Sequence, residues 1–273
     1  MTVTTLEKKD SIIDASVPSA GRIYDYLLGG HHNFEVDRQA AERLLELQPF
    51  MAKVMRLQRW CLQDIAEELT VRRGFDTIID FASGLPTNDH LHHVVPEGTT
   101  VIYSDYDPVV VEYAQEILGD TPNVHFFKAD AGRPEELLYR PEVEEILDGK
   151  RDVALIYWGV SIFLTDEDLI PVPRTLYDWA GPASCLAFNA QGAGADPNVP
   201  EMAELFKIYE QTGTPLHIRS VETYREWLLP WQPDGEGFIS LLEWHGFDQS
   251  EMSAEDRRAF GPAGAGYGVY LSK

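Results

Sequence analysis

Hydrophobic and polar residues follow two different patterns along the chain. Between residues 35 and 48, and again between 51 and 69, apolar side chains recur with helical spacing, which predicts two amphipathic helices. From Thr77 onward, short apolar runs bounded by turn residues alternate with helix-like segments. This alternation is typical of an α/β protein built around a mostly parallel sheet.

The apolar runs predict a doubly wound sheet of seven strands with helices on both of its faces. The predicted strands are residues 77–80, 100–104, 124–127, 153–158, 184–188, 238–244 and 267–271. The predicted helices among them run from about 88 to 96, from 108, twice within 134–148, from 165, and near 200–212 and 221–229.

The helical residues that precede the first strand have no place in a strand–helix–strand alternation. We therefore expect residues 1–70 to form a tail followed by a helical cap or lid, and residues 71–273 to form the core. From residue 191 the pattern loosens around glycines and a proline, so the stretch near 191–240 is expected to be a variable insertion on the substrate side.

Charge and composition narrow the possible partners and compartment. The chain has 45 acidic and 22 basic residues and a net charge of −23, so it should repel nucleic acid and anionic membranes. Residues 1–14 lack the apolar core of a signal peptide, and the longest apolar run, 153–164, is too short to span a bilayer. A soluble cytoplasmic protein is expected, and its only cysteines, Cys61 and Cys185, are interpreted as core residues.

The first strand leads into the stretch that carries most information about a ligand. It ends in Asp80 and is followed by the small residues Ala82, Ser83 and Gly84, which let a ligand approach the backbone. Pro86 is suited to the first turn of a helix, so a strand, a tight loop and a helix start are predicted here. The loop lacks the glycine pattern of dinucleotide sites, and a carboxylate at position 80 suits an amino group or a sulfonium better than a pyrophosphate.

An acid follows the second strand at the distance expected for a residue that binds a ribose. Asp105 lies 21 residues beyond Gly84, and a carboxylate can accept two hydrogen bonds from a diol. The alternative is that Asp105 caps the next helix. Asp107, which directly precedes Pro108, fits the capping role better and leaves Asp105 free for a ligand.

These features together resemble the core of class I S-adenosylmethionine-dependent methyltransferases. The stretches PSAGRIYDYLLGGHHNFEVDRQAAERLL, DFASGLPT and IYSDYDPVVVEYA resemble, more specifically, a bacterial S-adenosyl methyltransferase family with a YDYLLGG-like N-terminal segment. The chain departs from that family at Ala82, usually glycine, at Ser83, usually threonine, and at His31 and His32, where a lysine and an acid are usual.

The resemblance implies a Rossmann-like class I methyltransferase fold with S-adenosylmethionine as the cofactor and S-adenosylhomocysteine as the product. It also implies that Asp130, after the third strand, receives the adenine amino group beside the Ala131 N–H. Tyr24 and Tyr26 could close over the cofactor and present an aromatic face to the sulfonium, or could simply be half-buried. The cofactor-binding candidates are Arg22, Tyr24, Tyr26, Gly30, Asp80, Ala82, Ser83, Gly84, Asp105, Tyr106, Asp130, Ala131 and Trp158.

Histidines supply the candidates for a catalytic base and for a metal site. His31 and His32, together with Tyr24, are the catalytic candidates because they lie in or beside the expected lid. His90, His92 and His93 do not share one helix face, so a solvated helix surface is expected there and no metal.

The function that the sequence favours is methyl transfer from S-adenosylmethionine to a small molecule. Two alternatives remain: a module that binds S-adenosylmethionine without catalysis, and a nicotinamide-dependent oxidoreductase on a Rossmann sheet. The methyl acceptor, its reacting atom, the catalytic base and the oligomeric state are left open.

Overall fold

A computed structural model describes residues 16–87, 89–193, 200–248, 250–261 and 265–273, without the side chains of residues 200 and 201. Almost all of the tail expected at the N-terminus lies outside these ranges. The helices are α1 (Ala20–Leu27), α2 (Glu35–Leu47), α3 (Met51–Glu67), α4 (Pro108–Leu118), α5 (Glu135–Leu138), α6 (Pro141–Leu147), α7 (Asp166–Leu169), α8 (Val172–Trp179), α9 (Pro200–Gln211), α10 (Val221–Trp227), α11 (Leu241–Trp244) and α12 (Ala254–Phe260).

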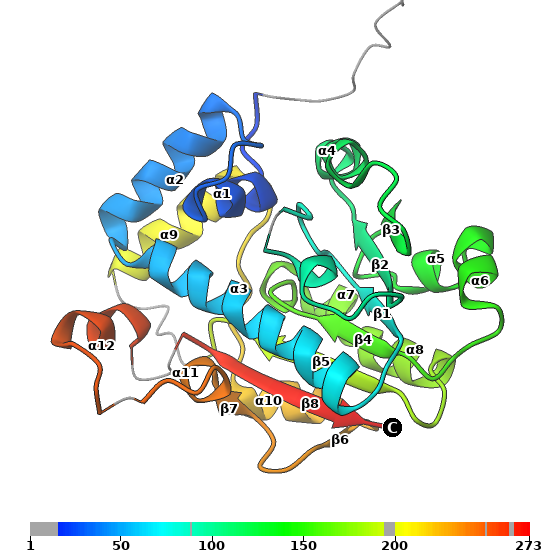
Figure 1. The fold of residues 1–273 in the computed structure, drawn as a ribbon. Helices are drawn as coiled ribbons and strands as arrows, with labels where there is room; N and C mark the ends of the chain where they lie inside the picture. Colours follow the sequence, from blue (N-terminus) through cyan, green and yellow to red (C-terminus); the bar gives the residue numbers. More distant parts are fainter. Residues whose placement is uncertain (1–15, 88, 194–199, 249, 262–264) are drawn as a thin grey trace, which may run out of the picture.

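The centre of the molecule is one eight-stranded sheet with the strand order β3-β2-β1-β4-β5-β8-β6, in which β7 also pairs with β8 (Figure 1). Strands β1 to β5 pair with one another in parallel, and β8 runs antiparallel to β5, β6 and β7. The strands are β1 (Thr77–Asp80), β2 (Thr100–Asp105), β3 (Val124–Lys128), β4 (Ala154–Tyr157), β5 (Cys185–Ala190), β6 (Gln232–Pro233), β7 (Ile239–Ser240) and β8 (Tyr267–Ser272).

The predicted fold class is confirmed, but the closing strands differ from the prediction. The strand expected over 238–244 is a two-residue strand followed by helix α11, because the Ser240 hydroxyl accepts a hydrogen bond from the Glu243 N–H and starts a helix there. The strand β6 and the helix α12 have no counterpart in the prediction.

Helices cover both faces of the sheet because side chains alternate along each strand. On β1, Ile78 faces a cluster with Leu62 and Ile65 of α3, whereas Ile79 faces a cluster with residues of α5, α6, α8 and α10. Helix α3 therefore lies along the sheet itself (Figure 1), and it ends in a π-helical turn, Glu68–Arg72.

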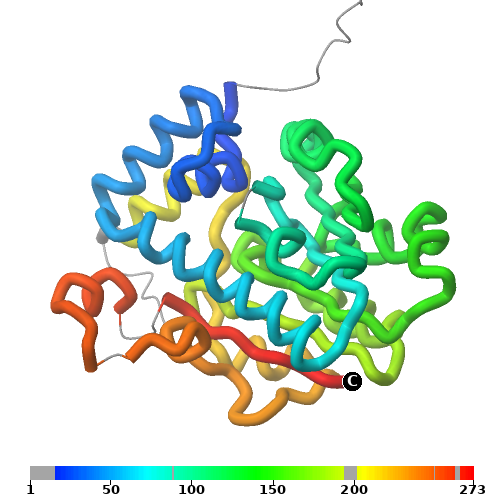
Figure 2. Tube along the Cα trace, viewed as in Figure 1, coloured from blue at the N-terminus to red at the C-terminus, as the bar shows by residue number. Residues whose placement is uncertain are grey.

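A third apolar cluster joins the N-terminal helices to a helix from the variable region. Ile23 of α1 and Leu44 of α2 pack with Leu205 and Tyr209 of α9 and with Met55 at the start of α3. Figure 2 shows the blue N-terminal trace beside the yellow α9 segment. The part of the expected cap that does not lie on the sheet is thus α1 and α2, while α3 packs on the strands.

The connection after β1 differs from the predicted strand, loop and helix. Residues 85–87 are not helical, and the only helical residues in the described part of the stretch 81–99 are the 3-10 turn Leu91–His93. The Thr87 N–H instead donates to the Leu85 carbonyl, and Pro86 sits inside a turn. No helix in the described part of the chain is long and apolar enough to cross a membrane.

Candidate functional site

A cavity of about 340 Å³ lies at the carboxyl ends of β1, β2, β3 and β4. The loops after these four parallel strands form its floor, as expected for the ligand site of an open α/β sheet. Residues of α1 and α3 form another part of its wall. The predicted candidates that line it are Tyr24, Asp80, Ala82, Ser83, Gly84, Asp105, Tyr106, Asp130, Ala131 and Trp158.

The loop after β1 exposes its backbone to this cavity. Ala82 has a φ of 53° and Gly84 a φ of 66°, both in the left-handed region. A φ in that region costs an alanine about 1–2 kcal/mol, so the loop keeps its turn at Ala82 at some energetic cost. The Gly84 N–H donates to Asp105 Oδ2 at 3.1 Å, and the Ser83 N–H donates to the Ser104 carbonyl at 2.9 Å.

His90 contacts the same loop through a side-chain hydrogen bond. The prediction of a solvated histidine surface is wrong here, because His90 has no solvent exposure. Its Nδ1 accepts from the Leu91 N–H, so its Nε2 carries the proton and donates to the Ser83 carbonyl at 3.1 Å. Burial holds the pKa of His90 well below its usual range, so the ring is neutral.

Asp107 caps the helix after β2 as the sequence predicted, and Asp105 lines the cavity. The Asp107 carboxylate accepts from the Val109 N–H at 2.8 Å and caps α4. Asp105 is buried beside the cavity, where its oxygens accept from the Asp107 N–H at 2.9 Å and from the Gly84 N–H. Burial raises the pKa of Asp105 to about 6, against the opposing effect of these two N–H groups.

Two buried groups of opposite charge lie farther along the cavity wall. Asp80 is 2% exposed and Arg59 of α3 is 3% exposed. Burial raises the pKa of Asp80 well above its usual range, the Arg59 charge opposes this rise, and Asp105 adds to it. Asp80 Oδ2 and the Arg59 Nε and Nη1 have no hydrogen-bond partner among the described residues.

Arg59 is held in place by contacts that leave hydrogen-bonding capacity free. Its guanidinium lies 5.4 Å from the centre of the Tyr24 ring, and its Nη1 lies 3.8 Å from an Asp89 oxygen. Gln58, also on α3, lines the cavity with an amide nitrogen that has no partner in the described structure. Neither residue was among the candidates predicted from the sequence, although a polar residue at each position interrupts an apolar helical stripe with Met55 and Leu62.

Asp130 and Tyr106 line the cavity from the loops after β3 and β2. The Asp130 carboxylate accepts from the Gly132 N–H at 2.9 Å and from Arg133 at 2.7 Å. The Tyr157 hydroxyl donates to the Ala131 carbonyl, so the Ala131 backbone is fixed at the cavity wall. The Tyr106 side chain is 55% exposed and lies at the rim.

The structure places five of the predicted candidates elsewhere. Arg22, Tyr26, Gly30, His31 and His32 do not line the cavity. The Arg22 guanidinium, a predicted cofactor-binding group, instead contacts Asp37 Oδ2 at 2.8 Å and Asp107 Oδ2 at 3.4 Å. The Tyr26 hydroxyl contacts Glu42, and His32 packs its ring edge on Tyr113.

Gly30 is required by packing at the turn after α1. A Cβ at this position would overlap the Asp25 carboxylate, which accepts hydrogen bonds from the His32 N–H and the Asn33 amide. Asp25 thus closes the YDYLLGG turn, and the glycine leaves room for it. No cluster of three or more histidine, cysteine or acidic residues in the described ranges has the arrangement of a metal site.

Comparison with known proteins identifies the family of this chain. The family profile described as S-adenosyl methyltransferase matches residues 6–267. The chain belongs to the S-adenosyl methyltransferase family. It is an S-adenosylmethionine-dependent methyltransferase, which sets aside the oxidoreductase and binding-module alternatives.

Two solved structures share nearly the whole fold with this methyltransferase. A candidate methyltransferase from Thermobifida fusca YX is 26% identical, with a TM-score of 0.83 and coverage of 95% of this chain and 96% of that one. A DUF574 family protein from Streptomyces avermitilis MA-4680 is 25% identical, with a TM-score of 0.82 and coverage of 95% and 99%. No curated protein matches the chain significantly.

Proposed function

We propose that the cavity at the carboxyl ends of β1–β4 is the S-adenosylmethionine site and that the methyl acceptor is a small molecule. The observation that carries the assignment is the pair Arg59 and Asp80, a guanidinium and a carboxyl group that are both buried and incompletely hydrogen-bonded in one cavity. Buried polar atoms without partners are uncommon in native proteins. The amino-acid end of the cofactor carries a carboxylate and an ammonium group, which match this pair.

The rest of the cavity suits the nucleoside end. Asp105 would accept hydrogen bonds from the ribose hydroxyls while its other contacts hold it against the Gly84 N–H. Asp130 and the Ala131 backbone would receive the adenine, and the small residues of the loop would let the ligand approach. The Trp158 indole nitrogen is buried at the end of β4 without a partner among the described residues and would face the bound ligand.

The bound cofactor supplies an already activated methyl group, so the chain mainly positions the reactants and excludes water. Residues 18–34 would act as a lid in this proposal, because Ser19, Tyr24 and Leu27 line the cavity. Of the three candidates for a base, Tyr24 lies at the cavity, whereas His31 and His32 lie outside its wall.

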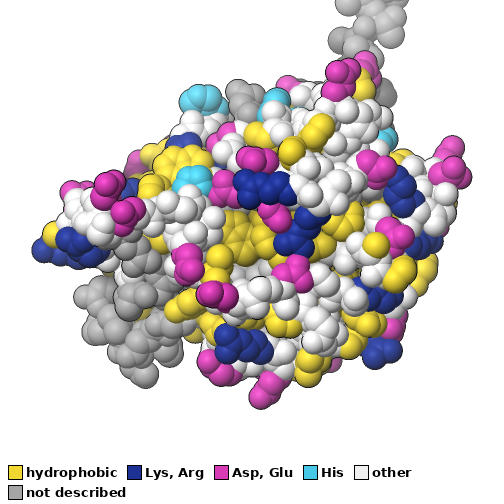
Figure 3. All heavy atoms as spheres, turned by 60° about the horizontal axis from the view of Figure 1, so that its bottom comes forward, with side chains coloured by type: hydrophobic (Ala, Val, Ile, Leu, Met, Phe, Trp, Pro, Cys, Tyr) yellow, Lys and Arg dark blue, Asp and Glu magenta, His cyan; other side chains and the backbone are white. Residues whose placement is uncertain are grey.

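The sequence is also the basis for what we propose about compartment, partners, metal requirement and chain organisation. We infer a cytoplasmic enzyme with no nucleic-acid or membrane partner and no metal requirement, organised as a cap within residues 1–70 and a core from 71 to 273. The net charge of −23 supports the absence of a nucleic-acid or anionic-membrane partner. On the face in Figure 3, lysine and arginine side chains are scattered among acidic ones and form no basic stripe.

Calorimetry with two ligands tests the site assignment. Arg59→Leu should weaken binding of S-adenosylhomocysteine by roughly tenfold or more, because a hydrogen-bonded charge contributes about 1.5–3 kcal/mol. The same variant should bind 5′-methylthioadenosine, which lacks the amino-acid group, with unchanged affinity. Asp105→Asn should weaken both ligands, and the exposed Arg72→Leu should weaken neither. Normal S-adenosylhomocysteine affinity in both cavity variants would refute the assignment.

A further inference from the structure

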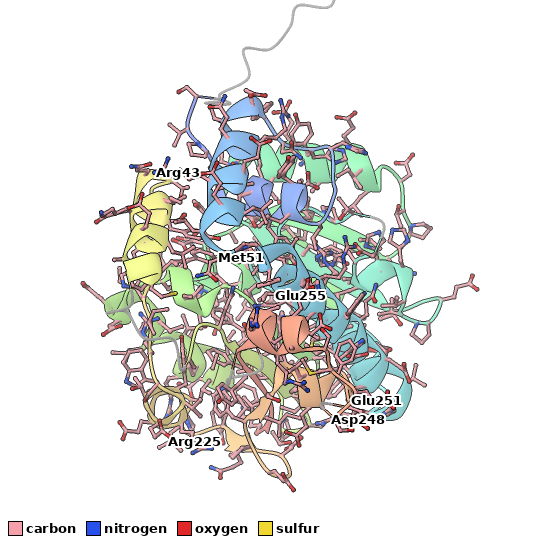
Figure 4. The ribbon with its side chains drawn as sticks, turned by 90° about the vertical axis from the view of Figure 1, so that its left-hand side faces the viewer. Arg43, Met51, Arg225, Asp248, Glu251 and Glu255 are labelled. Atoms are coloured by element: carbon pink, nitrogen blue, oxygen red, sulfur yellow. The ribbon has the colours of Figure 1, made fainter. Side chains whose placement is uncertain are left out.

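A second cavity of about 310 Å³ adjoins the first. It lies among the start of α3, α9, α12 and the loop after β5, and Figure 4 shows α12 crossing α3 near Met51 and Glu255, with α9 alongside α2. The two cavities share a wall made by Met55, Gln58, Phe163, Gln191 and Tyr209. A molecule in the second cavity would therefore lie next to one in the first.

The second cavity is lined mainly by apolar side chains. Most of it is aliphatic, aromatic or thioether, including Met51, Met202, Leu205 and Ile218. Arg258, exposed at the rim on α12, is its only charged side chain among the residues that the structure describes. A wall of this kind, whose only charge is positive, suits an apolar ligand that is neutral or anionic.

The shared wall carries hydrogen-bond donors but no base within the described residues. Gln58 is 4% exposed and its amide nitrogen has no partner. Gln191 converges with it on the end of β4, because a Cβ at Gly159 would lie 3.6 Å from the Gln191 amide oxygen and 3.9 Å from that of Gln58. Burial raises the pKa of Tyr209 to about 12, so its hydroxyl stays protonated and can donate.

We propose that the second cavity binds the methyl acceptor, and that this acceptor is an apolar molecule whose reacting atom is an oxygen anion, such as an aromatic carboxylate. The inference rests on the cofactor site proposed above. The amide of Gln58 would orient the anionic oxygen at the shared wall, and the apolar side chains of α3 and α9 would surround the ring.

This acceptor class is consistent with a wall that lacks a base. The acceptor oxygen uses a lone pair to form the new bond to the methyl carbon, and the electron pair of the broken carbon–sulfur bond returns to sulfur. The products are a methyl ester and the neutral thioether, and no proton has to be removed. An amine acceptor would enter as an ammonium group and would need both a base and a counter-charge.

Two probes with the same ring test the proposal by calorimetry on protein saturated with S-adenosylhomocysteine. We expect 1-naphthoate to bind at least about tenfold more tightly than 1-naphthylmethylamine. Gln58→Glu, which places a like charge beside the carboxylate, should abolish this preference. With S-adenosylmethionine, mass spectrometry should detect methyl 1-naphthoate.

A matched pair of variants on α12 locates the probe. Ala259 lines only the second cavity, so Ala259→Phe should weaken naphthoate binding by about tenfold or more and leave S-adenosylhomocysteine affinity unchanged. Ala254, exposed at the start of the same helix, lines neither cavity, and Ala254→Phe should change neither affinity.

The outcomes distinguish an incorrect cofactor site from an incorrect acceptor class or acceptor site. If S-adenosylhomocysteine itself does not bind, the cofactor site is wrong. If it binds but naphthoate does not, or if the amine binds as well as the carboxylate, the acceptor class is wrong. If naphthoate binds equally to the wild type and to Ala259→Phe, the second cavity is not the acceptor site.

Discussion

Arg22 and Asp107, 85 residues apart in the sequence, meet with Nη1 3.4 Å from Oδ2. The same Asp107 oxygen accepts from the Ser19 hydroxyl at 2.9 Å. Asp107 caps α4 just two residues beyond Asp105. Its carboxylate therefore links the N-terminal segment that carries Ser19 and Arg22 to the loop after β2, which lines the cavity. Arg22 therefore anchors the proposed lid rather than facing the cavity.

The Arg22 anchor should matter for stability. Arg22→Met should lower the free energy of unfolding by about 3–5 kcal/mol, because it leaves the carboxylate of Asp37, which has no solvent exposure, without its cation. Urea unfolding measures this. The matched variant Arg38→Met breaks an exposed ion pair with Glu35 in the same cap and should leave the midpoint almost unchanged. Equal midpoints for the two variants would show that Arg22 is no anchor.

His90 should act as a positioning residue for the cofactor loop. His90→Asn should weaken S-adenosylhomocysteine binding by about tenfold, because the shorter side chain cannot reach the Ser83 carbonyl. His90→Gln, whose amide nitrogen replaces Nε2, should restore most of the affinity. A role in packing alone would make both variants alike, and calorimetry beside thermal unfolding distinguishes the cases.

Because of Asp105, the stability of the protein and its affinity for the cofactor should change with pH in opposite directions. Its pKa is about 6 in the folded protein against an ordinary value of 3.8, so between these values the folded state holds a proton that the unfolded state releases. Stability from this group therefore falls as pH rises through that window. Relative to Asp105→Asn, the wild type should lose about 1–1.5 kcal/mol of unfolding free energy between pH 5 and pH 7.5.

Cofactor affinity should change with pH in the other direction. A carboxylate that accepts from ribose hydroxyls must be ionised, so S-adenosylhomocysteine should bind more weakly as pH falls below about 6, and Asp105→Asn should remove this dependence. Calorimetry at several pH values checks it. A pH-independent affinity in the wild type would remove Asp105 from direct contact with the ligand.

Gly30 should prove to be a folding requirement. Gly30→Ala forces a methyl group against the Asp25 carboxylate, so thermal unfolding should shift downward by the equivalent of about 1–3 kcal/mol. Gly29→Ala is the comparison, since its Cβ would meet nothing within 4 Å although its φ of 85° is strained. If only Gly29→Ala is destabilised, backbone conformation and not the Asp25 contact governs this turn.

Local patterns in the sequence determined much of this protein. The five parallel strands were predicted because each is a short apolar run, and all but the edge strand β3 are almost wholly buried. The Asp107 cap was predicted because capping depends on neighbours within one turn. Asp80, Gly84 and Asp105 could be brought to one edge of the sheet because parallel strands share the direction of their carboxyl ends.

The tertiary structure decided what depends on distant partners. Nothing near Arg22 in the sequence shows that its guanidinium will contact Asp107, 85 residues farther along the chain. The burial of His90 depends on Ser83 and Tyr103, and the exposure of Gln58 to both cavities depends on α9 and the loop after β5. The periodicity of apolar residues in the sequence shows which face of a helix or strand is apolar. It does not show which residues of other elements contact that face, because those contacts depend on how the elements pack, and this packing forms the site.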